Sequence, residues 1–197
     1  MTPAAPRAVI FDLDGTLADS VLDFDAIREE ICLAPGLPIL EQLADATPAE
    51  LERAEAIMRR HELAAIAGAT LTDGCAALLG HLTALEIPMG ILTRNIREVV
   101  ETFARAFDFR FHAVYTREDG PPKPSPVGVL ALCEKLGAHP AETLTVGDYK
   151  FDVLAGRRAG CRTVLLRAEP LPPQDHEAWG APDLVVASLR ELLPLFS

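Results

Sequence analysis

Two aspartates, separated by one residue, lie where the first buried strand of the chain is expected to end. Asp12 and Asp14 follow the apolar run Arg7–Phe11, and Gly15 comes directly after them. Carboxylates at positions i and i+2 point the same way in a continuing strand, and a turn at Gly15 would let them converge on one site. Such a pair can divide its work, one group serving as nucleophile or metal ligand and the other as acid and base. A solvated acidic turn would show the same pattern.

A second acidic pair lies in the segment Gly147–Asp152, between an expected strand and an expected helix. Asp148 and Asp152 are four residues apart, and two acids near a helix start can hold a hard cation or position its ligands. The plain alternative is favourable negative charge at a helix N-terminus.

Two further groups follow expected strands. The triplet Thr93, Arg94 and Asn95 offers a hydroxyl and backbone N–H groups at a helix start, which suit a phosphate oxygen, although a plain N-cap looks the same. Lys123 lies among prolines in Pro121–Pro126, so its ammonium group would be presented from an ordered backbone. A single lysine is more often just solvated surface.

Alternating strands and helices would bring these groups to one edge of a sheet. The apolar runs that predict strands are Arg7–Phe11, Ile87–Leu92, His112–Tyr115, Thr143–Val146, Arg162–Leu166 and Asp183–Val186. The helical patterns between them are Gly74–Leu85, Ile96–Phe107, Pro126–Leu136 and Phe151–Ala159. This alternation predicts an α/β fold, a parallel sheet with helices on both faces, whose ligands bind at the carboxyl ends of the strands.

One segment, residues 20–72, shows no strand pattern and is rich in Ala, Leu, Glu and Arg. Thr47, Pro48 and Glu50 form a strong helix start, and this helix should run to about Ala67. Two shorter helices are expected earlier, over residues 24–33 and 39–46. We therefore expect a core domain of residues 1–19 and 73–197, with a small all-helical cap, residues 20–72, inserted after the first strand.

The composition of the chain disfavours some classes of binding partner. The formal net charge of the 197 residues is -11, which disfavours a nucleic-acid partner because phosphate backbones need a basic face. The chain contains no run of about 18 apolar residues, so we expect no membrane span. Acidic residues follow where the apolar stretch of a secretory signal would continue, so we expect no signal peptide. The four cysteines form no C-x-x-C pair, so reduced thiols are favoured over disulfides or zinc. We expect a cytoplasmic monomer or homodimer that acts on a small phosphorylated metabolite.

The four clusters together resemble the motifs of the haloacid dehalogenase-like superfamily. DLDGT from Asp12, the threonine at position 93, KPSP from Lys123 and GDYKFD from Gly147 match its four motifs in order. The resemblance implies a Rossmann-like three-layer fold with strand order 3-2-1-4-5, which would bring Asp12 and Asp148 together. The insertion is similar to the C1 cap of the phosphoglycolate phosphatase-like branch, in a shorter form.

The resemblance also implies roles for single residues. Asp12 would be the nucleophile and form an aspartyl-phosphate, and Asp14 would protonate the leaving oxygen and later deprotonate water. Thr93 and Lys123 would complete the catalytic set. The residues expected to contact the phosphate are Asp12, Gly15, Thr93, Arg94 and Lys123.

The implied cofactor is Mg²⁺, held by Asp12, Asp148 and the backbone carbonyl of Asp14, with Asp152 supporting the site through water. The predicted function is a Mg²⁺-dependent phosphatase for a small phosphate monoester, with phosphoglycolate and sugar phosphates as candidates. A sugar-phosphate mutase and a non-catalytic binding protein are the alternatives, whereas the acid at Asp14 disfavours a dehalogenase. The cap residues considered as contacts for an anionic substrate, of which we expect at most one to serve, are Arg28, Arg53, Arg59, Arg60 and His61.

Overall fold

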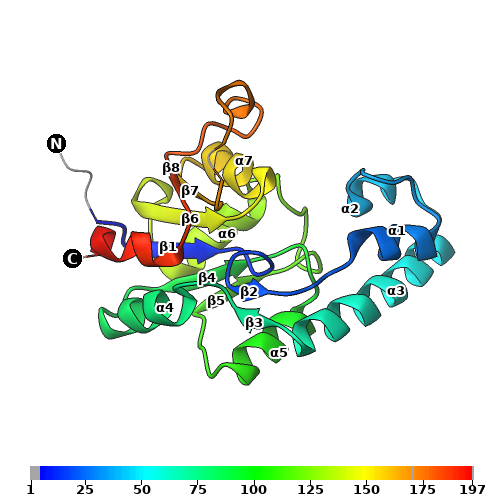
Figure 1. Ribbon diagram of the computed structural model, residues 1–197, viewed down its shortest axis with the longest axis horizontal. Helices are drawn as coiled ribbons and strands as arrows, with labels where there is room; N and C mark the ends of the chain where they lie inside the picture. The colour runs from blue at the N-terminus through cyan, green and yellow to red at the C-terminus, as the bar shows by residue number, and fades with distance from the viewer. Residues whose placement is uncertain (1–4, 170, 197) are drawn as a thin grey trace. The chain divides into compact units, whose positions relative to one another are not determined.

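The computed structural model describes residues 5–169 and 171–196, and its central element is a six-stranded parallel sheet (Figure 1). The strands are β1 (Ala8–Phe11), β4 (Met89–Leu92), β5 (Ala113–Tyr115), β6 (Thr143–Gly147), β7 (Arg162–Leu166) and β8 (Leu184–Val186). Their order across the sheet is β5-β4-β1-β6-β7-β8, and all neighbours pair in parallel. This order confirms the predicted 3-2-1-4-5 arrangement and adds β8 at one edge.

The central strand β1 lies between β4 and β6, and every residue of these three strands is buried. Strands buried on both faces are rich in apolar residues, which is why these segments are recognisable in the sequence, although β6 also carries the buried Thr143 and Thr145. Phe11 at the end of β1 is in register with Val146 near the end of β6. The segments that carry Asp12 and Asp148 therefore leave the sheet from neighbouring strand ends.

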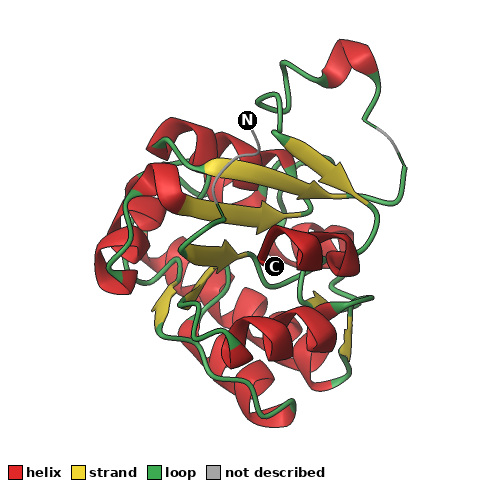
Figure 2. Ribbon diagram, turned by 90° about the vertical axis from the view of Figure 1, so that its left-hand side faces the viewer, coloured by secondary structure: helices red, strands yellow, loops and turns green. Residues whose placement is uncertain are grey.

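Helices lie on both sides of the sheet, as Figure 2 shows. They are α4 (Cys75–Ala84), α5 (Arg97–Ala106), α6 (Val127–Leu136) and α7 (Lys150–Ala159), with the 3₁₀ segments η1 (Pro140–Glu142), η2 (Pro173–Asp175) and η3 (Leu189–Phe196). Ile10 of β1 packs with Val129 and Leu132 of α6 in one buried cluster, and α4 packs against η3. All four core helices agree with the sequence patterns to within two residues at each end.

A short antiparallel pair corrects one expectation. β2 (Ala18–Asp19) pairs with β3 (Thr70–Leu71), so the expectation of no strand in residues 20–72 was wrong at Thr70–Leu71. Thr72 reinforces this pair, because its hydroxyl donates a 2.5 Å hydrogen bond to the carbonyl of Thr16. Strands of two residues are too short to show an alternating pattern, and their pairing partner is distant in the chain.

Residues 20–69 form a compact helical unit of their own, built from α1 (Phe24–Ile31), α2 (Ile39–Gln42) and α3 (Pro48–Ala67). The predicted start of α3 is confirmed: Thr47 and Glu50 make a reciprocal capping box, and Pro48 is the first helical residue. A separate apolar core holds the unit together, with Ile27, Ile39, Leu43, Ala54 and Met58 as its buried members. No helix among the described residues is long and apolar enough to cross a bilayer.

Candidate active site

The chain leaves β1 through a tight turn that holds the two aspartates of the first motif. The N–H of Asp12 still donates to the carbonyl of Val146 at 2.9 Å, so this residue remains attached to β6. Beyond it, the carbonyl of Leu13 accepts hydrogen bonds from three successive N–H groups, and Gly15 adopts a φ of 72°. Glycine takes this left-handed conformation at little cost, as predicted, and Asp14 is thereby held in the turn.

Lys123 lies between two carboxylates. Its Nζ is 2.5 Å from Oδ1 of Asp12 and 2.6 Å from Oδ1 of Asp152, and its side chain is 3% exposed. Burial by itself would lower the pKa of Lys123, but the two carboxylates outweigh this effect and raise the pKa. The ammonium group therefore stays protonated and places a fixed positive charge beside the expected nucleophile.

Three carboxylates meet at the ends of β1 and β6. Asp12, Asp148 and Asp152 each offer an oxygen, and these oxygens lie within 4.8 Å of one another. Burial, and then the charge of Asp152, raises the pKa of Asp148 to about 7, and burial also raises the pKa of Asp12 well above its usual value despite Lys123. The cluster thus contains three carboxylates and one ammonium group, so the carboxylates outnumber the cation. An excess of negative charge and hard oxygen donors is what Mg²⁺ binds.

Asp152 has both oxygens engaged by protein donors. Oδ1 accepts from Lys123, and Oδ2 accepts from the N–H of Tyr149 at 3.1 Å. A Cβ atom at Gly147 would lie 2.1 Å from Cγ of Asp152, so only glycine lets the carboxylate come this close to β6. These contacts orient Lys123 and the first turn of α7. The role expected for Asp152, support of Mg²⁺ through water, stays a prediction.

Gly15 brings the first and fourth motifs together. A Cβ atom at Gly15 would lie 2.2 Å from Oδ2 of Asp148, so a larger residue would displace this carboxylate. A hollow of about 440 Å³ opens beside the two residues. Its other walls come from the β2–β3 pair and from the segments that follow β7 and β8.

The segment after β4 contributes Thr93 and Asn95. Thr93 is 2% exposed, and its N–H donates to the carbonyl of Tyr115 at 3.0 Å. Its hydroxyl oxygen accepts from the N–H of Asn95 at 3.1 Å, which leaves the hydroxyl proton able to bind a phosphate oxygen. The side-chain amide of Asn95 donates to the carboxylate of Asp14. Asn95 was not among the predicted site residues, and its place in the triplet after the strand was the available signal.

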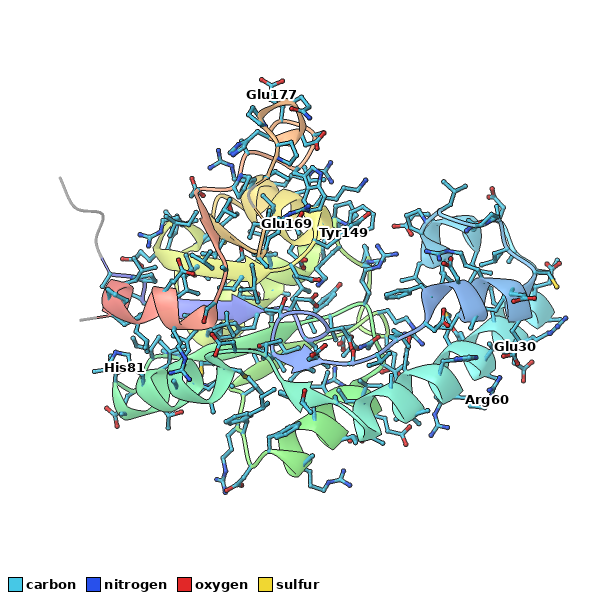
Figure 3. The ribbon with its side chains drawn as sticks, viewed as in Figure 1. Glu30, Arg60, His81, Tyr149, Glu169 and Glu177 are labelled. Carbon is cyan, nitrogen blue, oxygen red and sulfur yellow. The ribbon has the colours of Figure 1, made fainter. Side chains whose placement is uncertain are left out.

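Arg94 is held by the loop of Lys123 and by α7. Its Nη1 donates to the backbone carbonyl of Lys123 at 2.6 Å, and its guanidinium group lies 4.9 Å from the centre of the Phe151 ring. The ring of Tyr149, labelled in Figure 3, packs edge-on against Phe151 and Trp179 at centroid distances of 5.1 and 5.5 Å. Arg94 therefore connects the segments that follow β4, β5 and β6.

Arg28, Arg53, Arg60 and His61, which were considered as contacts for the substrate, have partners within the helical unit. Glu30 accepts hydrogen bonds from His61 and Arg60, and these hydrogen bonds lower the pKa of its carboxyl group. Glu30 and Arg60 are labelled in Figure 3. Arg28 binds Asp25 at 2.6 Å, and Arg53 contacts the backbone carbonyl of Glu30 at 3.4 Å. These four candidate cations thus contact groups of the unit itself.

Comparison with known proteins agrees with this geometry. A family model described as haloacid dehalogenase-like hydrolase matches residues 9–166. A phosphoglycolate phosphatase of Chromobacterium violaceum is 32% identical, with 96% of each chain covered. An N-acetylmuramic acid 6-phosphate phosphatase of Pseudomonas aeruginosa is 29% identical, with 95% of this chain and 93% of that protein covered. The crystal structure of a hydrolase from Pseudomonas syringae is 25% identical and aligns with a TM-score of 0.77 over 95% of this chain and 96% of that one.

A parallel α/β sheet with clustered acids and a buried lysine at its carboxyl edge defines a phosphoryl-transfer type of site. The family model and the relatives show that the chain belongs to the haloacid dehalogenase-like hydrolase family. Within that family it is a hydrolase of the phosphatase kind.

Proposed function

We propose that this protein is a Mg²⁺-dependent phosphatase that hydrolyses a small phosphate monoester through an aspartyl-phosphate on Asp12. The observation that carries the proposal is the cluster of Asp12, Lys123, Asp148 and Asp152, in which one ammonium group contacts the nucleophile and a second carboxylate. A carboxylate and a phosphate dianion repel each other, so attack requires positive charge between them.

The residues of the chain divide the reaction between them. Lys123 offsets the charge of Asp12 and of the incoming phosphoryl group, and the hydroxyl of Thr93 binds a phosphate oxygen. Asp14 donates a proton to the leaving oxygen and then accepts one from the water that hydrolyses the intermediate. Gly15 provides backbone next to the phosphate without a side chain in the way.

Mg²⁺, when bound by Asp12, Asp148 and the carbonyl of Asp14, would neutralise charge on the nucleophile and on the phosphate. Asp152 supports this site through the orientation of Lys123 and through water. The raised pKa values of Asp12 and Asp148 support the assignment, since a divalent cation would remove the repulsion between these groups.

The substrate class follows from the relatives, whose names specify phosphoglycolate and N-acetylmuramic acid 6-phosphate. We propose a small phosphorylated metabolite of this type, met in the cytoplasm by a monomer or homodimer, rather than a nucleic acid or a membrane. The four cysteines are free thiols, which suits a reducing compartment.

The test is a panel of phosphate esters assayed with and without Mg²⁺, with wild-type protein and with Asp12→Asn. The panel contains phosphoglycolate, N-acetylmuramic acid 6-phosphate, hexose phosphates and p-nitrophenyl phosphate. We expect hydrolysis that requires Mg²⁺ and a loss of at least about 10³-fold in Asp12→Asn, because the amide is no longer an anionic nucleophile. Equal turnover by the variant would refute the covalent mechanism.

A sugar-phosphate mutase of the same fold is the competing function, and it would use the same carboxylates. The two enzymes differ in what the phosphorylated Asp12 does next. In a phosphatase the phosphoenzyme decays in water alone, whereas in a mutase it persists until a sugar hydroxyl accepts the phosphoryl group. Rapid-quench measurement of ³²P on the protein, with and without added sugar, separates the two.

A further inference from the structure

Asn95, the only asparagine of the chain, is buried next to a carboxylate assigned to acid–base chemistry. Its side chain is 6% exposed, and its Nδ2 donates to Oδ2 of Asp14. A carboxylate oxygen can only accept, so the NH₂ end of the amide faces Asp14.

The backbone of Asn95 is held on both sides. Its N–H donates to Oγ1 of Thr93 at 3.1 Å, and its carbonyl accepts from the N–H of Arg117 at 3.2 Å. Asp14 is held equally closely, because the following turn is closed by a 2.8 Å hydrogen bond from the N–H of Gly15 to the carbonyl of Ala18. Two fixed backbones thus bring one amide donor against one carboxylate oxygen.

We infer that Asn95 is a positioning residue that orients the carboxyl group of Asp14 for proton transfer to the leaving group. This inference rests on the proposed phosphatase function. The torsion of a carboxyl group about its last bond is broad, so without a partner the group would sample many orientations. The hydrogen bond from Asn95 to Oδ2 restricts this torsion and so limits the directions in which the carboxyl group can exchange a proton with the substrate.

The proton balance of both steps agrees with this arrangement. In the first step the Asp12 oxygen forms a bond to phosphorus, the ester P–O bond breaks towards the leaving oxygen, and the carboxyl group of Asp14 supplies the proton. The resulting carboxylate keeps its hydrogen bond from Asn95. In the second step water attacks phosphorus, the bond to Asp12 breaks towards Asp12, and the carboxylate of Asp14 takes the proton from water.

The decisive measurement compares leaving groups. The kcat/KM value reports the steps up to departure of the leaving group. An alkoxide needs a proton to leave, whereas p-nitrophenolate leaves readily without one. We expect kcat/KM of Asn95→Ala to fall about 100-fold for glycerol 2-phosphate and less than about threefold for p-nitrophenyl phosphate, since general acid catalysis contributes at least this much.

Controls separate positioning from general damage to the fold. Asp14→Ala should show the same dependence on the leaving group, and adding Asn95→Ala to it should cost little more, because the two changes affect one function. An equal loss with both esters, no loss with either, or a larger loss with p-nitrophenyl phosphate would overturn the role of Asn95. Hydrolysis of neither ester by wild-type protein would overturn the proposed function, and this role with it.

A spectroscopic readout does not depend on activity. Selective labelling with ¹⁵N-asparagine gives a single side-chain NH₂ pair, because the chain contains only Asn95. We expect this pair to shift in Asp14→Ala and to stay unchanged in Glu134→Ala, which removes an exposed acid on α6. An unchanged pair in Asp14→Ala would show that the contact is absent in solution and would overturn the inference even if the enzyme is active.

Discussion

Nζ of Lys123 lies 2.5 Å from Oδ1 of Asp12, and the lysine side chain is almost fully buried. The same nitrogen contacts Asp152 at 2.6 Å, so one cation holds two carboxylates that would otherwise repel each other. This contact couples the stability of the core to the chemistry of the site.

Removal of the ammonium group should therefore destabilise the metal-free protein. We expect Lys123→Met to lower the free energy of unfolding by about 3–5 kcal/mol in EDTA, the usual cost of leaving buried charges without their partner. Mg²⁺ should reduce the loss, because it neutralises the same carboxylates. Urea unfolding with and without Mg²⁺ measures both effects. The control is Arg157→Met, which breaks a half-exposed 2.8 Å pair with Asp183 and should cost less than about 1 kcal/mol.

The pH dependence of metal binding follows from Asp148. Its pKa is raised from 3.8 to about 7 in the folded protein, so the folded state binds this proton more tightly than the unfolded state does. The contribution of this group to stability is complete below about pH 4 and is lost as the pH rises through about 7. Mg²⁺ binds the ionised carboxylate and competes with the proton, so its affinity should rise over the same range.

We accordingly expect Mg²⁺ to raise the Tm more at about pH 8 than at about pH 5. Thermal unfolding by circular dichroism, with and without Mg²⁺, measures this difference. Asp148→Asn should abolish most of the Mg²⁺ effect and should stabilise the metal-free protein at the higher pH, because it removes the cost of burying the charge and the repulsion with Asp152. The same Mg²⁺ stabilisation at both pH values would contradict the prediction.

Gly15 and Gly137 offer a matched pair of substitutions. Both have a left-handed φ, 72° and 66°, but a Cβ atom at Gly15 would collide with Asp148 whereas nothing lies within 4 Å of one at Gly137. Each change to alanine should cost about 1–2 kcal/mol in backbone strain. Only Gly15→Ala should also lose Mg²⁺ affinity and activity, as calorimetric Mg²⁺ titration and the ester assay would show. Loss of Mg²⁺ binding in both variants would point to strain alone.

Arg94 allows a direct phosphate contact to be distinguished from support of the Lys123 loop. Its 2.6 Å hydrogen bond to the Lys123 carbonyl and its contact with Phe151 favour support. We expect Arg94→Lys to lower kcat about tenfold or more with little change in KM, because an ammonium group cannot reproduce the planar contact. The control is Arg105→Ala, which changes an exposed arginine. Steady-state kinetics measure kcat and KM of Arg94→Lys. A rise in KM alone would favour a direct contact between Arg94 and the phosphate.

Most of the fold can be predicted from local patterns. The central strands β1, β4 and β6 are rich in apolar residues because they are buried on both faces, and α3 begins at a capping box that is local in sequence. The acids of the first and fourth motifs could be predicted for the same reason, since each follows a strand whose end is visible in the sequence. The β2–β3 pair could not, because two-residue strands have no period and their pairing depends on distant residues.

The residue types alone showed that the chain carries the acids, the lysine and the threonine of a phosphoryl-transfer site, in an order that resembles one family. Only the tertiary structure determines which side-chain atoms of these residues lie in contact. Parallel pairing of β1 with β6 puts Asp12 beside Asp148, and burial of Lys123 places its charge between two carboxylates. The contact between Asn95 and Asp14 spans 81 residues, and no local pattern encodes it because its distance depends on the packing of the whole sheet.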